Sequence, residues 1–115
     1  MTRDYTVYLS DIAENMAQAA IFIGSMSYQE FTEDRKTVYA VRCFEIIREA
    51  TKNIPTNIQE MCPNIPWSAM ARIRDKCIHA YWGINHQIVW SAVKDELPVY
   101  QPLIQMFLVE LKKAG

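Results

Sequence analysis

The sequence predicts an all-α protein, an up-and-down bundle of about five helices that forms a single domain over residues 1–115. Hydrophobic residues recur at steps of three and four along most of the chain, which is the period of a helix with one buried face. No segment alternates between hydrophobic and polar residues as a half-buried strand does. Half of the residues are hydrophobic, which is enough to fill one core.

The first helix is predicted from Tyr5 to about Ile23, because the hydrophobic pattern begins and ends there. Gly24 interrupts the pattern and favours a helix end. In the stretch that follows, Phe31 is expected to fill the core between this helix and the next.

The second helix is predicted to begin near Thr32 and to end near Asn53, since Pro55 disfavours helical geometry in the residue before it. A short turn of helix is expected over 57–61. The buried face of the second helix is predicted to consist of Val38, Val41, Phe44, Ile47 and Ala50.

A third long helix is predicted from Trp67, directly after the proline-rich loop, to Gly83, which can end it in a left-handed cap. A further helix is expected over 84–97, and a last helix after Pro98. Helices in so short a chain commonly leave one hydrophobic stripe uncovered by the rest of the domain. Self-association would cover such a stripe.

Composition narrows the class of function. The 12 Lys and Arg residues against 13 Asp and Glu give a formal charge of −1, so any contact with RNA must be local. Only three glycines occur, which excludes a Gly-rich phosphate-binding loop. Three cysteines without C-x-x-C spacing suit a reducing cytoplasm, and the charged N-terminal stretch resembles neither a signal peptide nor a membrane span.

The segment R-D-K-C-I-H-A-Y, from Arg74 to Tyr81, carries the candidate chemistry. On a helix, Asp75 could face His79 and fix its tautomer. His79 could then remove a proton from a ribose 2′-hydroxyl, while the Arg74 guanidinium stabilises charge on the phosphate. Arg74 and His79 are offset by about 140° on an ideal helix, so their convergence requires the long arginine side chain, a distortion or a second subunit.

These residues alone leave the question open, since a histidine on a helix is more often an ordinary polar partner. No metal site or cofactor is predicted, because Cys77, His79 and His86 match no known ligand spacing. Cys77 has no clear activating base apart from His79 and is not expected to act as a nucleophile. Three other basic residues could form a phosphate-binding rim, but such residues are more often solvated: Arg42, Arg72 and Lys76.

The same segment resembles the R-x(4-6)-H motif of the HEPN superfamily, and more narrowly the R-x(4)-H-x-Y form of HepT-like toxins, at Arg74, His79 and Tyr81. Asp75 also fits, as the polar residue after the arginine. The resemblance extends over nearly the whole chain, through YLSDIAENM, EFTEDRKTVYAVRCFEIIREATKNIP and PNIPWSAMARIRDKCIHAYWGINHQIVWSAVKDELP. Arg48 is a departure, since relatives are expected to carry a small residue there.

The resemblance implies a homodimer whose two motif helices face each other and form a metal-independent ribonuclease site, with Arg74 and His79 as the essential pair. It also implies a partner, a minimal nucleotidyltransferase antitoxin of the MntA type, which transfers AMP from ATP to Tyr81. A bulky anionic group on Tyr81 would exclude the RNA phosphate from the site. The alternative is a non-catalytic helical dimer that binds a nucleotidyltransferase or presents a substrate to it.

Overall fold

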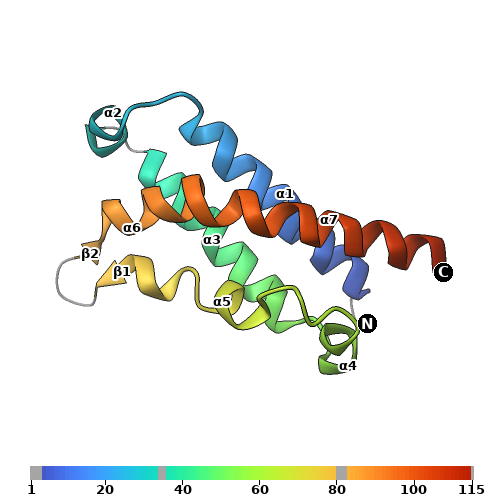
Figure 1. Ribbon diagram of the computed structural model, residues 1–115. Coiled ribbons are helices and arrows are strands. Elements are labelled where there is room, and N and C mark those ends of the chain that lie inside the picture. The colour runs from blue at the N-terminus through green and yellow to red at the C-terminus, as the bar shows by residue number, and fades with distance from the viewer. Residues whose placement is uncertain (1–3, 34–35, 80–82, 115) are drawn as a thin grey trace.

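The computed structural model describes residues 4–33, 36–79 and 83–114, and for Glu33, Lys36, His79 and Ala114 it describes the backbone alone. Three long helices, α1 (Tyr5–Ile23), α3 (Lys36–Lys52) and α7 (Leu97–Ala114), lie side by side along the molecule (Figure 1). α1 packs against both α3 and α7. The prediction of an all-α fold is confirmed.

The predicted bounds of the first helix are confirmed. The side chain of Asp4 caps α1 by accepting a hydrogen bond of 2.9 Å from the backbone N–H of Thr6. At the other end, Gly24 has a φ of +52° and donates its N–H to the carbonyl of Ala20. A short helix, α2 (Tyr28–Glu33), then places Phe31 fully inside the core, as predicted.

α3 ends at Lys52, one residue before the predicted end, and α4 (Thr56–Glu60) forms the short turn expected there. The prediction for Val38 was wrong, because its side chain is 57% exposed. In the first turn of α3, Thr37 is buried instead of Val38. Its hydroxyl contacts the carbonyl of Phe31 at 3.5 Å and Nδ1 of His86 at 3.2 Å, which satisfies a polar group inside the core.

The predicted helix from Trp67 to Gly83 was wrong in extent. It begins at Trp67 as expected, but α5 (Trp67–Ala71) is short and is followed by a turn and a 3-10 helix, η1 (Asp75–Cys77). The N–H of Ile73 bonds to the carbonyl of Met70, and that of Cys77 to Arg74, both three residues back. Met70, Ile73 and Cys77 are all fully buried, so the helical spacing of the sequence persists although the backbone is not a continuous α-helix.

After η1 the chain forms a small antiparallel hairpin, β1 (Ile78–His79) and β2 (Gly83–Ile84), in which His79 pairs with Gly83. Gly83 has a φ of +81°, a conformation that glycine adopts with least strain. The expectation of a left-handed Gly83 was right, but it serves a strand and not a helix cap. The sequence offered no alternating pattern, because two-residue strands are too short to show one.

The last part of the chain is one continuous helical run. α6 (His86–Ser91) passes through a π-helical turn, η2 (Ala92–Glu96), directly into α7. The predicted break at Pro98 was therefore wrong. The π turn widens the backbone just before this proline, where the ring would clash with the carbonyl four residues earlier in a regular α-helix.

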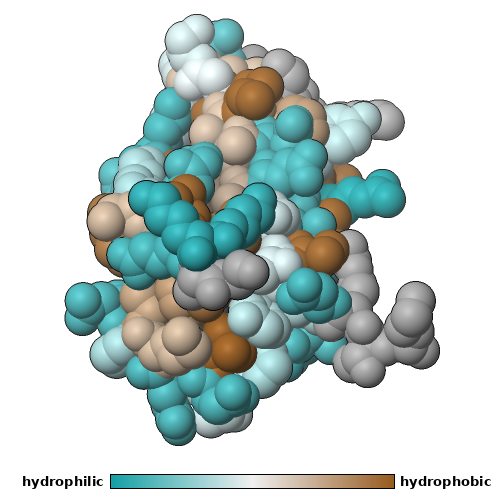
Figure 2. All heavy atoms as spheres, turned by 90° about the vertical axis from the view of Figure 1, so that its right-hand side faces the viewer, coloured by the Kyte–Doolittle hydropathy of each residue, from teal (hydrophilic) through white to brown (hydrophobic). Residues whose placement is uncertain are grey.

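Within the described residues, no helix is both long and apolar enough to cross a membrane. Several large hydrophobic side chains are at least half exposed, among them Val99, Met106 and Val109 on α7. Figure 2, which views the end of the molecule that carries both termini, shows hydrophobic spheres in separate patches among hydrophilic ones. The core lies around α1, which packs against α3 and α7, and it is completed by buried residues of α5, η1 and α6.

Candidate active site

The structure places the predicted site residues on three different kinds of backbone. Arg74 lies in the turn after α5, Asp75 opens η1, and His79 ends β1. Tyr81 lies outside the described residues. The predicted face-to-face arrangement of Asp75 and His79 on one α-helix is wrong, because the backbone becomes extended at Ile78.

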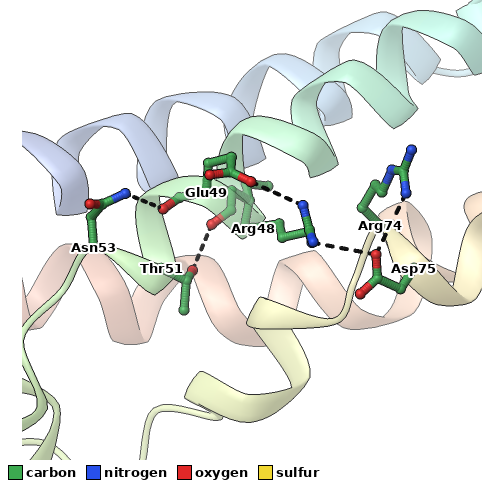
Figure 3. A network of polar contacts seen from close by, with 7 residues as sticks. Arg48, Glu49, Thr51, Asn53, Arg74 and Asp75 are labelled. Atoms are coloured by element: carbon green, nitrogen blue, oxygen red, sulfur yellow. Dashed lines mark hydrogen bonds and ion pairs between the residues drawn. The ribbon is translucent and has the colours of Figure 1, made fainter.

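Arg74 and Asp75 meet a third residue that the motif does not contain. Nη1 of Arg74 lies 3.7 Å from Oδ1 of Asp75, and Nε of Arg48, on α3, lies 3.4 Å from the same oxygen. In Figure 3, Arg48 reaches this carboxylate from the left and Arg74 lies above it. The site is therefore a carboxylate shared between two arginines.

Arg48 also contacts a second carboxylate, that of Glu49 on its own helix. Its Nη1 donates a hydrogen bond of 3.0 Å to Oε1 of Glu49. The end of α3 is braced by side chains that bond back to the helix, from Thr51 to the carbonyl of Ile47 and from Asn53 to that of Glu49 (Figure 3).

Both arginines keep unused donors. Among the described side chains, the Nε atoms of Arg48 and Arg74 are buried and make no hydrogen bond. The 3.4 Å contact between Arg48 and Asp75 is an ion pair without the alignment of a hydrogen bond. The side chain of Arg74 is about one-third exposed. The exposed part of the Arg74 guanidinium is suited to bind an anion such as phosphate, whereas its buried Nε is shielded from solvent.

A hollow of about 460 Å³ adjoins this cluster, lined by Ala69, Arg72, Asp75 and Lys76. Two of the three predicted rim residues, Arg72 and Lys76, thus lie together beside Asp75. Arg42 does not join them, because it lines a separate hollow on α3.

Lys76 ties the motif segment to the π turn. Its Nζ pairs with the carboxylate of Glu96, which also accepts a hydrogen bond of 3.1 Å from the hydroxyl of Tyr100. Burial, together with the negative charge of Glu96, raises the pKa of Tyr100. Lys76 therefore fixes the segment and is not a free cation at the rim.

Cys77 is a core residue. Burial raises the pKa of its thiol to about 11, and the thiol donates to the carbonyl of Ile73 at 3.1 Å. Because the thiolate is the reactive form, this environment disfavours a nucleophilic role. Across the side chains that the structure describes, no three His, Cys, Asp or Glu residues are grouped so as to hold a metal ion.

Comparison with known proteins identifies the family. The family model described as Ribonuclease HepT-like matches residues 12–107 of the chain. The chain belongs to the HepT-like family. "Probable ribonuclease HepT" of Thermococcus cleftensis is 44% identical over 99 residues, which cover 85% of this chain and 90% of that protein.

Two relatives in Methanocaldococcus jannaschii extend the match. "Putative RNase MJ0127" is 44% identical over 97 residues, covering 84% of this chain and 80% of the relative. "Putative RNase MJ0125" is 38% identical over 112 residues, covering 96% and 97%. No solved structure is significantly similar to the chain. The similarity to HepT-like proteins therefore extends over almost the full length and is not confined to the motif.

Sequence reasoning missed Arg48 as a site residue of this HepT-like protein. The contact joins residues 27 positions apart (75 − 48), and local patterns carry no information about such a pairing. One signal did exist, the presence of a long cation where the family resemblance implied a small residue.

Proposed function

We propose that this HepT-like protein is a metal-independent endoribonuclease that acts as the toxin of a toxin–antitoxin pair in the cytoplasm. The observation that carries the proposal is Arg74, whose guanidinium lies beside Asp75 and remains partly exposed, in a family whose relatives are named as ribonucleases. An RNA phosphate is the anion that such a site would bind.

The proposed reaction uses His79 as general base. It takes the proton of a ribose 2′-hydroxyl, and the resulting alkoxide attacks the adjacent phosphorus. The bond from phosphorus to the 5′-oxygen of the next nucleotide breaks, and that oxygen takes up a proton. The products are a 2′,3′-cyclic phosphate and a free 5′-hydroxyl. Arg74 stabilises the charge that develops on the phosphate oxygens.

A homodimer is part of the proposal. Val99, Met106 and Val109 leave exposed hydrophobic surface on α7, which favours association with a second copy. Two motif segments facing each other would form the cleft in which RNA is cut, as the family resemblance implies.

Regulation is proposed to occur at Tyr81. A minimal nucleotidyltransferase of the MntA type would transfer AMP from ATP to the phenol oxygen and release pyrophosphate. The added phosphate and nucleoside would compete with RNA both sterically and by charge. Intact-mass measurement after co-expression with such a partner should show an AMP-sized addition that Tyr81→Phe abolishes, and an unchanged mass would count against this step.

The decisive experiment is RNA cleavage by purified protein of verified unmodified mass, in excess chelator, over several RNA pools. Wild type is compared with His79→Ala, and the matched control is His86→Ala, which removes the only other histidine of the chain. We expect cleavage by wild type and by the His86 variant, and none by the folded His79 variant. Equal activity in all three, or none in wild type, would refute the ribonuclease and favour the non-catalytic binding module.

A further inference from the structure

Arg48 is the residue whose position the proposed function leaves unexplained. It is long and charged, it projects from α3, and only 25% of its side chain is exposed. It contacts one carboxylate on its own helix, Glu49, and one in the motif segment, Asp75. Partial burial of a guanidinium is costly unless its charge is used.

The charge on Asp75 creates a difficulty for phosphate binding. A carboxylate within 4 Å of Arg74 repels an arriving phosphate and competes with it for the same donors. Left alone, an arginine and a carboxylate tend to form a close two-pronged pair. Here the distance from Nη1 of Arg74 to Oδ1 of Asp75 is longer, at 3.7 Å. The same oxygen of Asp75 also contacts Arg48.

We propose that Arg48 is a positioning residue for Arg74: by holding and neutralising Asp75, it keeps the Arg74 guanidinium available for the RNA phosphate. The inference rests on the proposed function only in taking RNA phosphate as the ligand. Arg48 acts through Asp75 and is not itself required to touch the RNA.

The test is a double-mutant cycle read out by RNA binding. Wild type, Arg48→Met, Asp75→Asn and the double variant are titrated with a fluorescent 2′-O-methyl RNA oligonucleotide, which lacks the hydroxyl that cleavage requires. Methionine keeps much of the length of the side chain and removes its charge. We expect Arg48→Met to weaken binding by roughly tenfold, which corresponds to about 1.4 kcal/mol. In the Asp75→Asn background the same change should alter the Kd by less than about twofold.

Two further variants separate this role from alternatives. Arg48→Lys keeps a cation near Asp75 and should restore part of the lost affinity, although an ammonium cannot reach both carboxylates in the fixed geometry of a guanidinium. Lys112→Ala removes an exposed charge near the end of α7, far from the hairpin in Figure 1, and should change binding little. Thermal unfolding of each variant verifies that the compared proteins are folded.

Equal weakening by Arg48→Met in both backgrounds would overturn the inference, since Arg48 would then act independently of Asp75. Identical binding by the Met and Lys variants would also overturn it, because charge would not matter. Failure of wild type to bind the oligonucleotide at low salt would remove the phosphate site altogether. The expected coupling without cleavage of natural RNA would support the role of Arg48 while refuting the ribonuclease.

Discussion

Gly83→Ala should weaken both the fold and RNA cleavage. Gly83 is the strand partner of His79, and its backbone has a positive φ that alanine adopts only with strain. An added Cβ would have no heavy atom within 4 Å, so the cost is backbone strain alone. Left-handed backbone costs a non-glycine residue about 1–2 kcal/mol. With an unfolding entropy of about 2.1 cal/mol/K per residue, or roughly 0.24 kcal/mol/K for this chain, the Tm should fall by about 4–8 °C.

The effect on activity follows from the same pairing. If the alanine of this variant relaxes to a negative φ, the hairpin pairing is lost and the backbone of His79 shifts. A displacement of about 1 Å at a reacting group can reduce turnover up to a hundredfold, so we expect a loss of about tenfold to a hundredfold. The assay is the cleavage rate per folded molecule, measured well below the Tm. Gly83→Asn should recover part of both losses, since asparagine tolerates this conformation better.

Gly24→Ala is the matched control. Gly24 also has a positive φ, and an added Cβ there would lie 3.5 Å from the carbonyl oxygen of Ile21, an ordinary contact. It ends α1 and belongs neither to the hairpin nor to the motif segment, so its substitution should lower the Tm and leave turnover of the folded protein unchanged. An unaltered Tm in Gly83→Ala would refute the strain argument. Normal cleavage by a destabilised Gly83→Ala would refute the role of the hairpin in placing His79.

Four further outcomes test the packing of the core and of the site. At pH 8 an alkylating reagent should modify the half-buried Cys62 and spare Cys77 until the protein unfolds, and equal labelling of both would contradict the burial of Cys77. The pKa of the Cys77 thiol is raised from its ordinary value of 9.0 to about 11 in the folded protein. The stability that the protonated thiol contributes is therefore complete below pH 9.0 and is lost as the pH rises toward about 11, so the free energy of unfolding should fall over that interval. Trp67→Phe removes the donor that bonds at 3.1 Å to two carbonyls and should cost about 1–3 kcal/mol in denaturant unfolding, whereas a cost near zero would mean that these bonds contribute nothing. Phe31→Ala empties a fully buried position against Trp90 and should cost about 3–5 kcal/mol by the same measurement, with a cost below that of Trp67→Phe counting against its place in the core.

The long helices could be predicted because their ends carry local signals. Gly24 and Pro55 act on the residues beside them, and the hydrophobic period between such signals is long enough to be unambiguous. Thr37 and Val38 show the limit of this reasoning. The hydrophobic residue was assigned to the core, yet a hydroxyl that finds partners on two other elements can be buried in its place.

The motif segment was harder to predict because a continuous α-helix and a short α-helix followed by a turn and a 3-10 helix bury the same residues. Met70, Ile73 and Cys77 follow helical spacing through an α turn, a bend and a 3-10 turn alike. Asp75, which contacts Arg74, also contacts Arg48 on another helix, and this second contact forms only when α3 packs against α5. Tertiary packing, and not local propensity, therefore decides the chemistry at this point.

The hairpin changes what has to be explained about catalysis. On a continuous helix, Arg74 and His79 would be offset by about 140°, which would oppose their convergence within one subunit. That angle does not apply here, since the chain leaves helical geometry at Ile78 and His79 belongs to a strand. The backbone of His79 is paired with that of Gly83, and Arg74 contacts Asp75, which Arg48 also contacts. Substitutions in α5 that leave the His79–Gly83 pairing and the contacts of Asp75 intact should therefore reduce cleavage less than substitutions that break either of them.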